Sequence, residues 1–259
     1  MKIAFMGMGN MATALARGFI ASGKIAAADI IAFDPATDML LAKSAELGFT
    51  TAESAADAAR AADAILIACK PHQVNELVAS LGNSFSGKPV ISIALGWNYA
   101  RYQTLLCRDL RVQFVMPNTP AMVGEGVFLF EETTSLTADE LSFFKDLFGA
   151  IGTVMTLPSS LMGIGGAISG CGPAFVDLML EAFADAAVLY GIPRDKALAM
   201  VAATVKGSAK LQLETGMHPG VLKDMVCSPA GSTIRGVAAL EENGFRAACI
   251  AAIKAIMEK

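Results

Sequence analysis

The sequence is poor in charged residues, in histidine and in any regular cysteine pattern, and each shortage excludes a class of function. Only 17% of the 259 residues are charged; with a net charge of −4 and no basic cluster, we expect binding neither to nucleic acid nor to an anionic membrane. The two histidines, His72 and His218, stand far apart without metal-ligand spacing, so we expect no metal. The five cysteines are scattered and lack a C-x-x-C pair, which is typical of reduced thiols in a cytoplasmic protein.

A long uncharged hydrophobic run is also missing, although 54% of the residues are hydrophobic. The most apolar segment, 173–190, is interrupted by the acids Asp177, Glu181 and Asp185. It therefore falls short of the roughly 18–20 uncharged residues of a membrane-spanning helix. The N-terminus carries one lysine before a short apolar run that passes directly into glycines, which is not the pattern of a signal peptide. We therefore expect neither a membrane span nor a signal peptide.

The N-terminal segment carries a glycine motif directly after an apolar strand pattern. In Gly7-x-Gly9-x-x-Ala12, the first glycine permits a tight turn, the second lets the backbone approach a pyrophosphate, and the alanine lets a helix pack on the strand. A helix pattern at 10–22 and a strand pattern at 30–33 follow. Asp34 then stands about 20 residues beyond the motif, where a carboxylate meets a ribose. This order predicts a dinucleotide site that includes Gly7, Met8, Gly9, Asn10, Met11 and Ala12.

Strand and helix patterns alternate through the first half of the chain and then give way to helices alone. The later strand patterns lie at 64–69, 90–94, 112–115, 127–131 and 153–157, and the later helix patterns at 53–62, 71–81, 98–106 and 138–148. Such alternation predicts an α/β fold with a doubly wound, mostly parallel sheet of the Rossmann type over residues 1–157. Residues 158–259 are expected to form an all-helical domain, with helices at 161–190, 193–215, 219–227, 233–242 and 245–257.

Two of the C-terminal helix patterns are apolar on nearly every face. The helices expected at 173–190 and 245–257 carry only narrow polar stripes, and a helix of this kind must be buried on nearly every side. A lobe of about 100 residues cannot supply that burial by itself. We therefore expect the helical domain to be a dimerisation domain and the protein to be a homo-oligomer, at least a dimer.

The ends of the predicted strands carry further candidates for cofactor binding, because ligands of parallel sheets collect at the carboxyl ends of the strands. Asp34 favours NADH, since its carboxylate repels a 2′-phosphate. Lys70 can neutralise a cofactor phosphate, or it can be a solvated loop lysine. Asn118, between two prolines, can pair with a nicotinamide carboxamide, or it can hold an Asx-type turn. The expected cofactor contacts after the fourth strand are Ala68, Cys69, Lys70 and Pro71.

The segment 222–236 contains a helix break followed at once by a new helix. The first helix stops at Ser228-Pro229, the chain turns through Ala230-Gly231, and Ser232 or Thr233 suits the N-cap of the next helix. Such a junction directs unpaired backbone N–H groups and hydroxyls toward one point at the positive end of a helix. It can hold a small carboxylate or phosphate, or it can be an ordinary helix break.

A second glycine-rich segment, 165–173, opens the first long helix of the C-terminal half. Its glycines permit close backbone approach. Two interpretations are open: tight packing of the helix, or contact with a ligand.

These motifs together resemble those of the pyrroline-5-carboxylate reductase family, nearly end to end. The family motifs are matched at 7–12, by Cys-Lys-Pro at 69–71, by Met-Pro-Asn-Thr-Pro at 116–120, by Ser-Gly-Cys-Gly-Pro-Ala-Phe at 169–175, and by Leu-Lys-Asp-Met-Val-Cys-Ser-Pro-Ala-Gly-Ser-Thr at 222–233. The chain departs from the family pattern at Cys171, Phe175 and Ala230. The last departure leads us to expect that residue 230 does not need a positive φ.

The resemblance implies reduction of 1-pyrroline-5-carboxylate to L-proline by NAD(P)H, the last step of proline biosynthesis. It favours NADP(H), whereas Asp34 keeps NAD(H) plausible. It implies that Ser228, Gly231, Ser232 and Thr233 bind the substrate and that the Thr233 hydroxyl, the catalytic candidate, faces the ring nitrogen.

Two other functions stay open. One is a hydroxyacid or phosphogluconate-type dehydrogenase, disfavoured because no lysine occurs between Lys145 and Lys196 to serve as the base. The other is a dinucleotide-sensing regulator without turnover, in which the 228–233 loop binds a partner.

Overall fold

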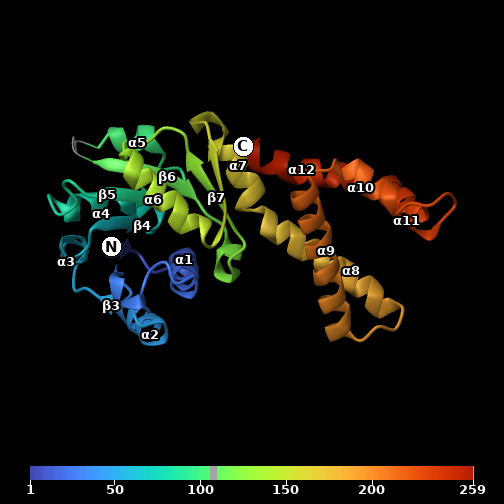
Figure 1. Cartoon of the computed structure of the whole chain (residues 1–259), viewed down its shortest axis with the longest axis horizontal. Coiled ribbons are helices and arrows are strands. Elements are labelled where there is room, and N and C mark those ends of the chain that lie inside the picture. The colour runs from blue at the N-terminus through green and yellow to red at the C-terminus, as the bar shows by residue number, and fades with distance from the viewer. Residues whose placement is uncertain (106–109, 259) are drawn as a thin grey trace. The chain divides into compact units, whose positions relative to one another are not determined.

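The computed structural model describes residues 1–105 and 110–258, and the chain divides into two compact units, Met1–Gly170 and Cys171–Lys259 (Figure 1). The first unit contains the sheet, and the described part of the second is helical with connecting turns, as the sequence patterns predicted. The first unit also includes helix α7 (Met162–Ser169), which lies beyond the boundary expected after residue 157. That boundary stays a prediction.

One mixed sheet of eight strands organises the first unit. The strand order is β3-β2-β1-β4-β5-β6-β7-β8, and neighbouring strands are parallel except for the antiparallel pair β6 and β7. The strands are β1 (Ile3–Met6), β2 (Ile30–Phe33), β3 (Thr50–Thr51), β4 (Ala64–Ile67), β5 (Pro89–Ser92), β6 (Arg111–Met116), β7 (Gly126–Glu131) and β8 (Gly152–Leu157). The predicted doubly wound, mostly parallel sheet is therefore confirmed.

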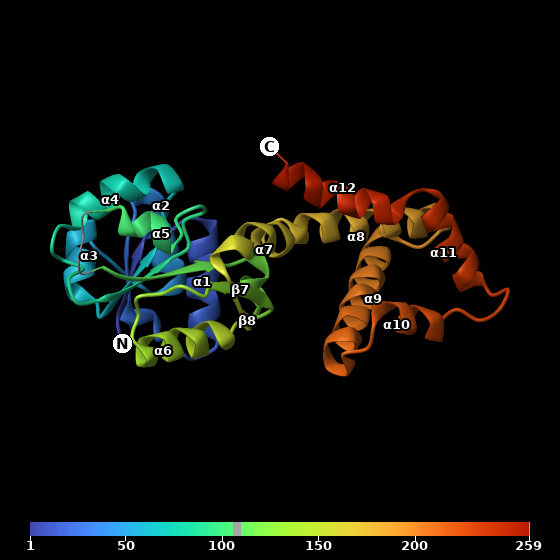
Figure 2. The ribbon, with the colours of Figure 1, turned by 90° about the horizontal axis from the view of Figure 1, so that it is seen from above.

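Alternate residues of β1 face two separate hydrophobic cores. Ile3 and Phe5 lie in the core beneath α1 (Asn10–Ala21) and α6 (Ala138–Gly149), while Ala4 and Met6 lie in the core of the other face. That second core is covered by α3 (Ala55–Ala61), α4 (Val74–Leu81) and α5 (Tyr99–Gln103), which lie across the sheet from α1 and α6 in Figure 2. Because both faces are covered, the central strands are apolar at nearly every position.

Two elements of the first unit have no clear pattern in the sequence. Helix α2 (Thr37–Leu47) buries only Leu40, so it lacks the apolar stripe that marks an amphipathic helix. Strand β3 has two residues and pairs only with β2. The helix expected at 98–106 is the shorter α5, and the end of that expected range falls outside the described residues.

The single helix expected at 161–190 is wrong, because the structure breaks it into α7 and α8 (Gly172–Leu189). The α7 glycines pack tightly on the sheet within the first unit. A Cβ added to Gly165 would lie 2.7 Å from methyl groups of Leu129 and Leu157, and one added to Gly166 would collide with the Met116 sulfur. Close packing therefore accounts for these two glycines.

The second unit buries very little of its own apolar surface. It consists of α8, α9 (Arg194–Thr215), α10 (Pro219–Met225), α11 (Ser232–Glu242) and α12 (Phe245–Met257). Helix α8 buries only Ala184 and α9 only Ala197, and within the described residues α10, α11 and α12 bury none. Leu178 is 67% exposed and Leu189 is 80% exposed. The helices expected to be apolar all round therefore present apolar faces that this chain does not cover.

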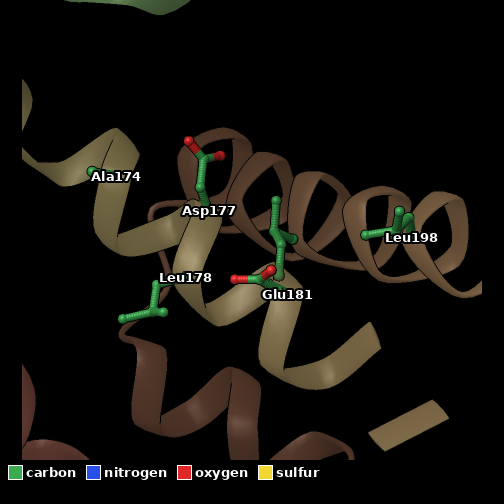
Figure 3. A pocket seen from close by; sticks show the side chains of 6 residues that line it. Ala174, Asp177, Leu178, Glu181 and Leu198 are labelled. Atoms are coloured by element: carbon green, nitrogen blue, oxygen red, sulfur yellow. The ribbon is translucent and has the colours of Figure 1, made fainter. Parts of the chain in front are cut away.

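The acidic stripe predicted on the long helix lies on α8. Asp177 and Glu181 line a hollow of about 560 Å³ beside α9, together with Ala174, Leu178, Leu180 and Leu198 (Figure 3). Asp185, one turn further on, forms an ion pair with Arg194 at the start of α9. Across residues 1–105 and 110–258, no helix has both the length and the apolarity to cross a membrane.

Replacing Gly166 with alanine tests the packing of α7. We expect Gly166→Ala to lower the free energy of unfolding by about 1–3 kcal/mol, because the new methyl group forces Met116 to move. Gly149→Ala, at the end of α6, is the matched control, since a Cβ there meets no atom within 4 Å. Urea unfolding of both variants measures the difference, and equal stability of the two variants would contradict the packing.

Candidate functional site

Gly7 ends β1 in a turn that only glycine fits. Its φ is +100°, and a Cβ added there would lie 2.9 Å from the backbone nitrogen of Cys69. Its N–H donates to the Phe33 carbonyl at 2.8 Å, and the Ala68 N–H donates to the Met6 carbonyl at 2.9 Å. The turn is thus tied to the ends of β2 and β4, and the structure brings residues 7–12, Asp34 and 68–71 to one edge of the sheet.

The first turn of α1 is open to an anionic ligand. Gly9 is its N-cap; no side chain caps the helix and no acidic residue lies in its first turn. Gly9 is exposed, and a Cβ added to it would meet no atom within 4 Å. Ala12 is buried in the core beneath the helix, which is the packing that the glycine motif requires. The free N–H groups of this turn fit a dinucleotide pyrophosphate.

Asp34 is a structural part of the glycine turn. One carboxylate oxygen accepts the Met8 N–H at 2.8 Å and the other accepts the Ala36 N–H at 2.9 Å. The carboxylate therefore joins the loop after β1 to the loop after β2. The motif spacing predicts a ribose contact for Asp34 but gives no sign of this second role; the ribose contact stays a prediction.

The segment 68–71 follows β4 directly. Burial, with a smaller contribution from the Asp34 charge, raises the pKa of the Cys69 thiol to about 11, so the thiol is neutral at physiological pH. The Pro71 carbonyl accepts the indole N–H of Trp97 at 2.7 Å, which anchors the loop to the segment between β5 and α5. The Lys70 side chain is exposed, and both interpretations of it stay open.

Asn118 has a structural role that the sequence did not suggest. Its side-chain N–H donates to the Ser169 carbonyl at 3.0 Å, and its side-chain oxygen accepts the Val127 N–H at 2.8 Å. The side chain is buried, with 5% of the residue exposed. Its amide thus ties β7 and α7 together, and its oxygen bonds to Val127 instead of forming a local Asx-type turn. The pairing with a nicotinamide stays a prediction.

Lys43 also contacts the glycine turn, which no sequence pattern predicted. Its ammonium donates to the Met8 carbonyl at 2.5 Å, although the two residues are far apart in the chain. No motif marks this lysine, because it lies on α2, the helix without a clear pattern. In the described ranges, no group of three or more His, Cys, Asp or Glu side chains is placed to hold a metal.

The loop between α10 and α11 forms a tight turn in the second unit. The Gly231 N–H donates to the Ser228 carbonyl at 3.0 Å, and a Cβ added to Gly231 would lie 2.5 Å from the Ser228 hydroxyl. Gly231, not Ser232 or Thr233, is the N-cap of α11, and no side chain caps the helix. The expected N-cap is therefore wrong. Gly231, whose backbone is extended, is the residue directly before the helix, so Ser232 already lies in the first turn. The exposed Thr233 hydroxyl is left without a capping role.

Ala230 has a left-handed backbone, with φ +58°. The expectation that this position does not need a positive φ is therefore wrong. The tight turn from Ser228 to Gly231 imposes the conformation, and the alanine Cβ makes it unfavourable by about 1–2 kcal/mol. Strain is thus present directly beside the open start of α11.

Comparison with known proteins matches both units to described families. Residues 159–259 match the family model for pyrroline-5-carboxylate reductase dimerisation, and residues 2–96 match the model for NADP oxidoreductase, coenzyme F420-dependent. The pyrroline-5-carboxylate reductase of Methanosarcina acetivorans is 42% identical over 97% of this chain and 94% of the relative. That of Escherichia coli is 40% identical over 100% of this chain and 96% of the relative. The chain belongs to the pyrroline-5-carboxylate reductase family.

A solved structure agrees with this assignment. The pyrroline carboxylate reductase of Plasmodium falciparum, with NADP bound, has a TM-score of 0.89 at 30% identity and covers 99% of this chain and 95% of its own. The fold predicted from the family resemblance is confirmed.

Membership of the pyrroline-5-carboxylate reductase family explains the exposed apolar faces of the second unit. The dimerisation model covers α8 to α12, the helices that bury almost nothing in one chain. The predicted homo-oligomer is therefore confirmed.

Replacing Ala230 with glycine tests the strain in the loop. We expect Ala230→Gly to raise stability by about 1 kcal/mol, because glycine adopts a positive φ freely and loses only part of that gain to its greater unfolded-state entropy. Ala239→Gly, within α11, is the matched control and should lower stability by about 0.5–1 kcal/mol. Thermal unfolding measures both changes, and a loss of stability in Ala230→Gly would show that the loop is not strained.

Proposed function

We propose that this chain reduces 1-pyrroline-5-carboxylate to L-proline with a reduced nicotinamide dinucleotide. The observation that carries the proposal is the uncapped start of α11, where the turn from Ser228 to Gly231 leaves the first N–H groups of the helix unpaired by any side-chain cap. This is a receptor for a small carboxylate, and it lies within the 222–233 motif that the chain shares with the family. Identity of 40–42% along nearly the whole chain to named reductases supports the same activity.

The residues of the chain have separate tasks in this proposal. The backbone N–H groups of Ser232 and Thr233 hold the substrate carboxylate, with the Ser228 hydroxyl and Gly231 shaping the turn. The Thr233 hydroxyl donates to the imine nitrogen, and the nitrogen takes its proton from solvent. The first turn of α1 holds the pyrophosphate, with 68–71 beside it. When bound, the cofactor supplies the hydride that adds to the imine carbon, so that the C=N bond becomes a C–N single bond.

This chemistry agrees with the groups that the chain lacks. Oxidation of a hydroxyacid requires a base to remove the alcohol proton, and no lysine lies between Lys145 and Lys196 in the sequence, so α8 has none. Reduction of an imine requires orientation and a hydrogen bond, which the loop at 228–233 supplies. Imine reduction is therefore favoured over the dehydrogenase alternative.

We propose that the chain uses both cofactors, with NADPH competent. The NADP-bound relative supports NADPH, whereas the Asp34 carboxylate disfavours a 2′-phosphate. The hydrogen bonds that Asp34 accepts from Met8 and Ala36 spread part of its charge into the backbone.

We assign the enzyme to the cytoplasm, because the four cysteines that the structure describes are free thiols.

Turnover with racemic pyrroline-5-carboxylate tests the proposal. We expect the purified chain to oxidise both NADPH and NADH with this substrate, with values of kcat/KM within about 100-fold of each other, which corresponds to about 2.7 kcal/mol. Absorbance of the reduced cofactor at 340 nm follows the reaction, and a hydroxyacid with the oxidised cofactor is the control. An inert protein that still binds cofactor would support the sensing alternative. A preference for NADH beyond 100-fold would remove NADPH from the proposal.

Substitution of Thr233 tests the role of its hydroxyl. Because this hydroxyl does not cap α11, Thr233→Ala should leave stability nearly unchanged while lowering kcat/KM by about 10- to 100-fold, the effect of losing one substrate hydrogen bond. Thr233→Ser keeps the donor and should keep most activity. Cofactor affinity should not change in either variant. If Thr233→Ala has the same kcat/KM as the parent chain, the hydroxyl has no role in the mechanism. The proposed carboxylate receptor would be unaffected, because it consists of backbone N–H groups.

A further inference from the structure

Charges of opposite sign hold the two backbone groups of Met8. The Asp34 carboxylate accepts the Met8 N–H at 2.8 Å, and the Lys43 ammonium donates to the Met8 carbonyl at 2.5 Å. Met8 is itself buried and lies between Gly7 and Gly9, the glycines of the dinucleotide motif. A ligand that approaches this turn therefore meets a cation as well as the carboxylate.

The Lys43 ammonium keeps hydrogen-bonding capacity for such a ligand. An ammonium has three N–H donors, and in the described ranges its one recorded acceptor is the Met8 carbonyl. The residue is half-buried, so its charge is screened less than that of an exposed lysine. Both Asp34 oxygens already accept backbone N–H groups. The lysine is therefore better prepared than the aspartate to form a new contact.

Some other cations in the first unit, such as Arg17 and Lys24, are compensated by acids. Arg17 pairs with Glu46 on α2 at 2.6 Å, and Lys24 pairs with Asp146 at 2.7 Å. Within the described part of the chain, Lys43 forms no ion pair. An uncompensated cation at the turn where the adenosine ribose is expected suits an additional phosphate group on that ribose.

We propose that Lys43 is a specificity-determining residue that binds the 2′-phosphate of NADPH and offsets its repulsion by Asp34. The inference rests on the proposed function, because it assumes that a dinucleotide occupies the turn. It explains how a chain with an acid at the end of β2 accepts both cofactors. The competing role is purely structural: Lys43 ties α2 to the turn. A tie affects every nucleotide equally, whereas a phosphate contact affects only nucleotides with a 2′-phosphate.

Binding of two adenosine phosphates to the full chain separates these roles without turnover. By isothermal titration calorimetry, Lys43→Met should weaken binding of 2′,5′-ADP by about 10-fold and of 5′-AMP by less than 2-fold, because only the first carries a 2′-phosphate. Lys43→Arg keeps the charge and should restore most of the affinity for 2′,5′-ADP. Lys24→Met, which removes an exposed lysine of the same unit, should change neither.

Kinetics supply a second readout. In Lys43→Met the KM for NADPH should rise about 10-fold with kcat little changed, while the KM for NADH stays within 2-fold. If Lys43→Met weakens binding of both adenosine phosphates equally, or weakens binding of neither, the assignment of Lys43 is overturned. Failure of the parent chain to bind either one would overturn the dinucleotide function and the assignment together. Normal binding without turnover on pyrroline-5-carboxylate would overturn only the reductase function and leave Lys43 assigned.

Discussion

The contact of the Gly7 turn with the backbone of Ala68 and Cys69 is the constraint on which the rest of the first unit depends. Strands β1 and β4 end side by side, and a side chain at residue 7 would occupy the space of the Cys69 peptide. The turn then places Met8 within reach of Asp34, and Gly9 at the start of α1. One absent Cβ thus allows three strand ends to share one edge of the sheet, which is where the proposed cofactor site lies.

Around this edge, polar side chains act first as structural ties. Asp34 joins two loops, Asn118 joins β7 to α7, and Lys43 joins α2 to the glycine turn. Such ties are needed because the loops after parallel strands have few backbone partners of their own. A residue that a motif assigns to a ligand can therefore also have a structural partner within the protein. Asn118, Asp34 and Lys43 each keep a donor or a lone pair beyond these ties, so a ligand contact of each stays a prediction or a proposal.

In the second unit, the notable groups have no partner within the described part of the chain. Its helices leave large apolar side chains such as Leu189 and Ile250 exposed in the single chain, and its functional loop exposes backbone N–H groups. The first feature is accounted for by association with another copy, as the match to the dimerisation model shows. We propose that a ligand accounts for the second. Ala230 lies in the tight turn that opens α11 and is held there at an unfavourable φ.

The sequence was sufficient to predict the fold class, the glycine turn, the helical second unit and the family, because these depend on periodicity, glycine positions and motif spacing along the chain. It did not determine α2, whose single buried residue leaves no stripe, or the break between α7 and α8. Only the tertiary structure showed that Asn118 bonds to Ser169, that Lys43 reaches Met8, and that Gly231 rather than Ser232 begins α11. These outcomes depend on partners distant in the chain and on backbone angles set by the whole turn, and neither can be read from local spacing.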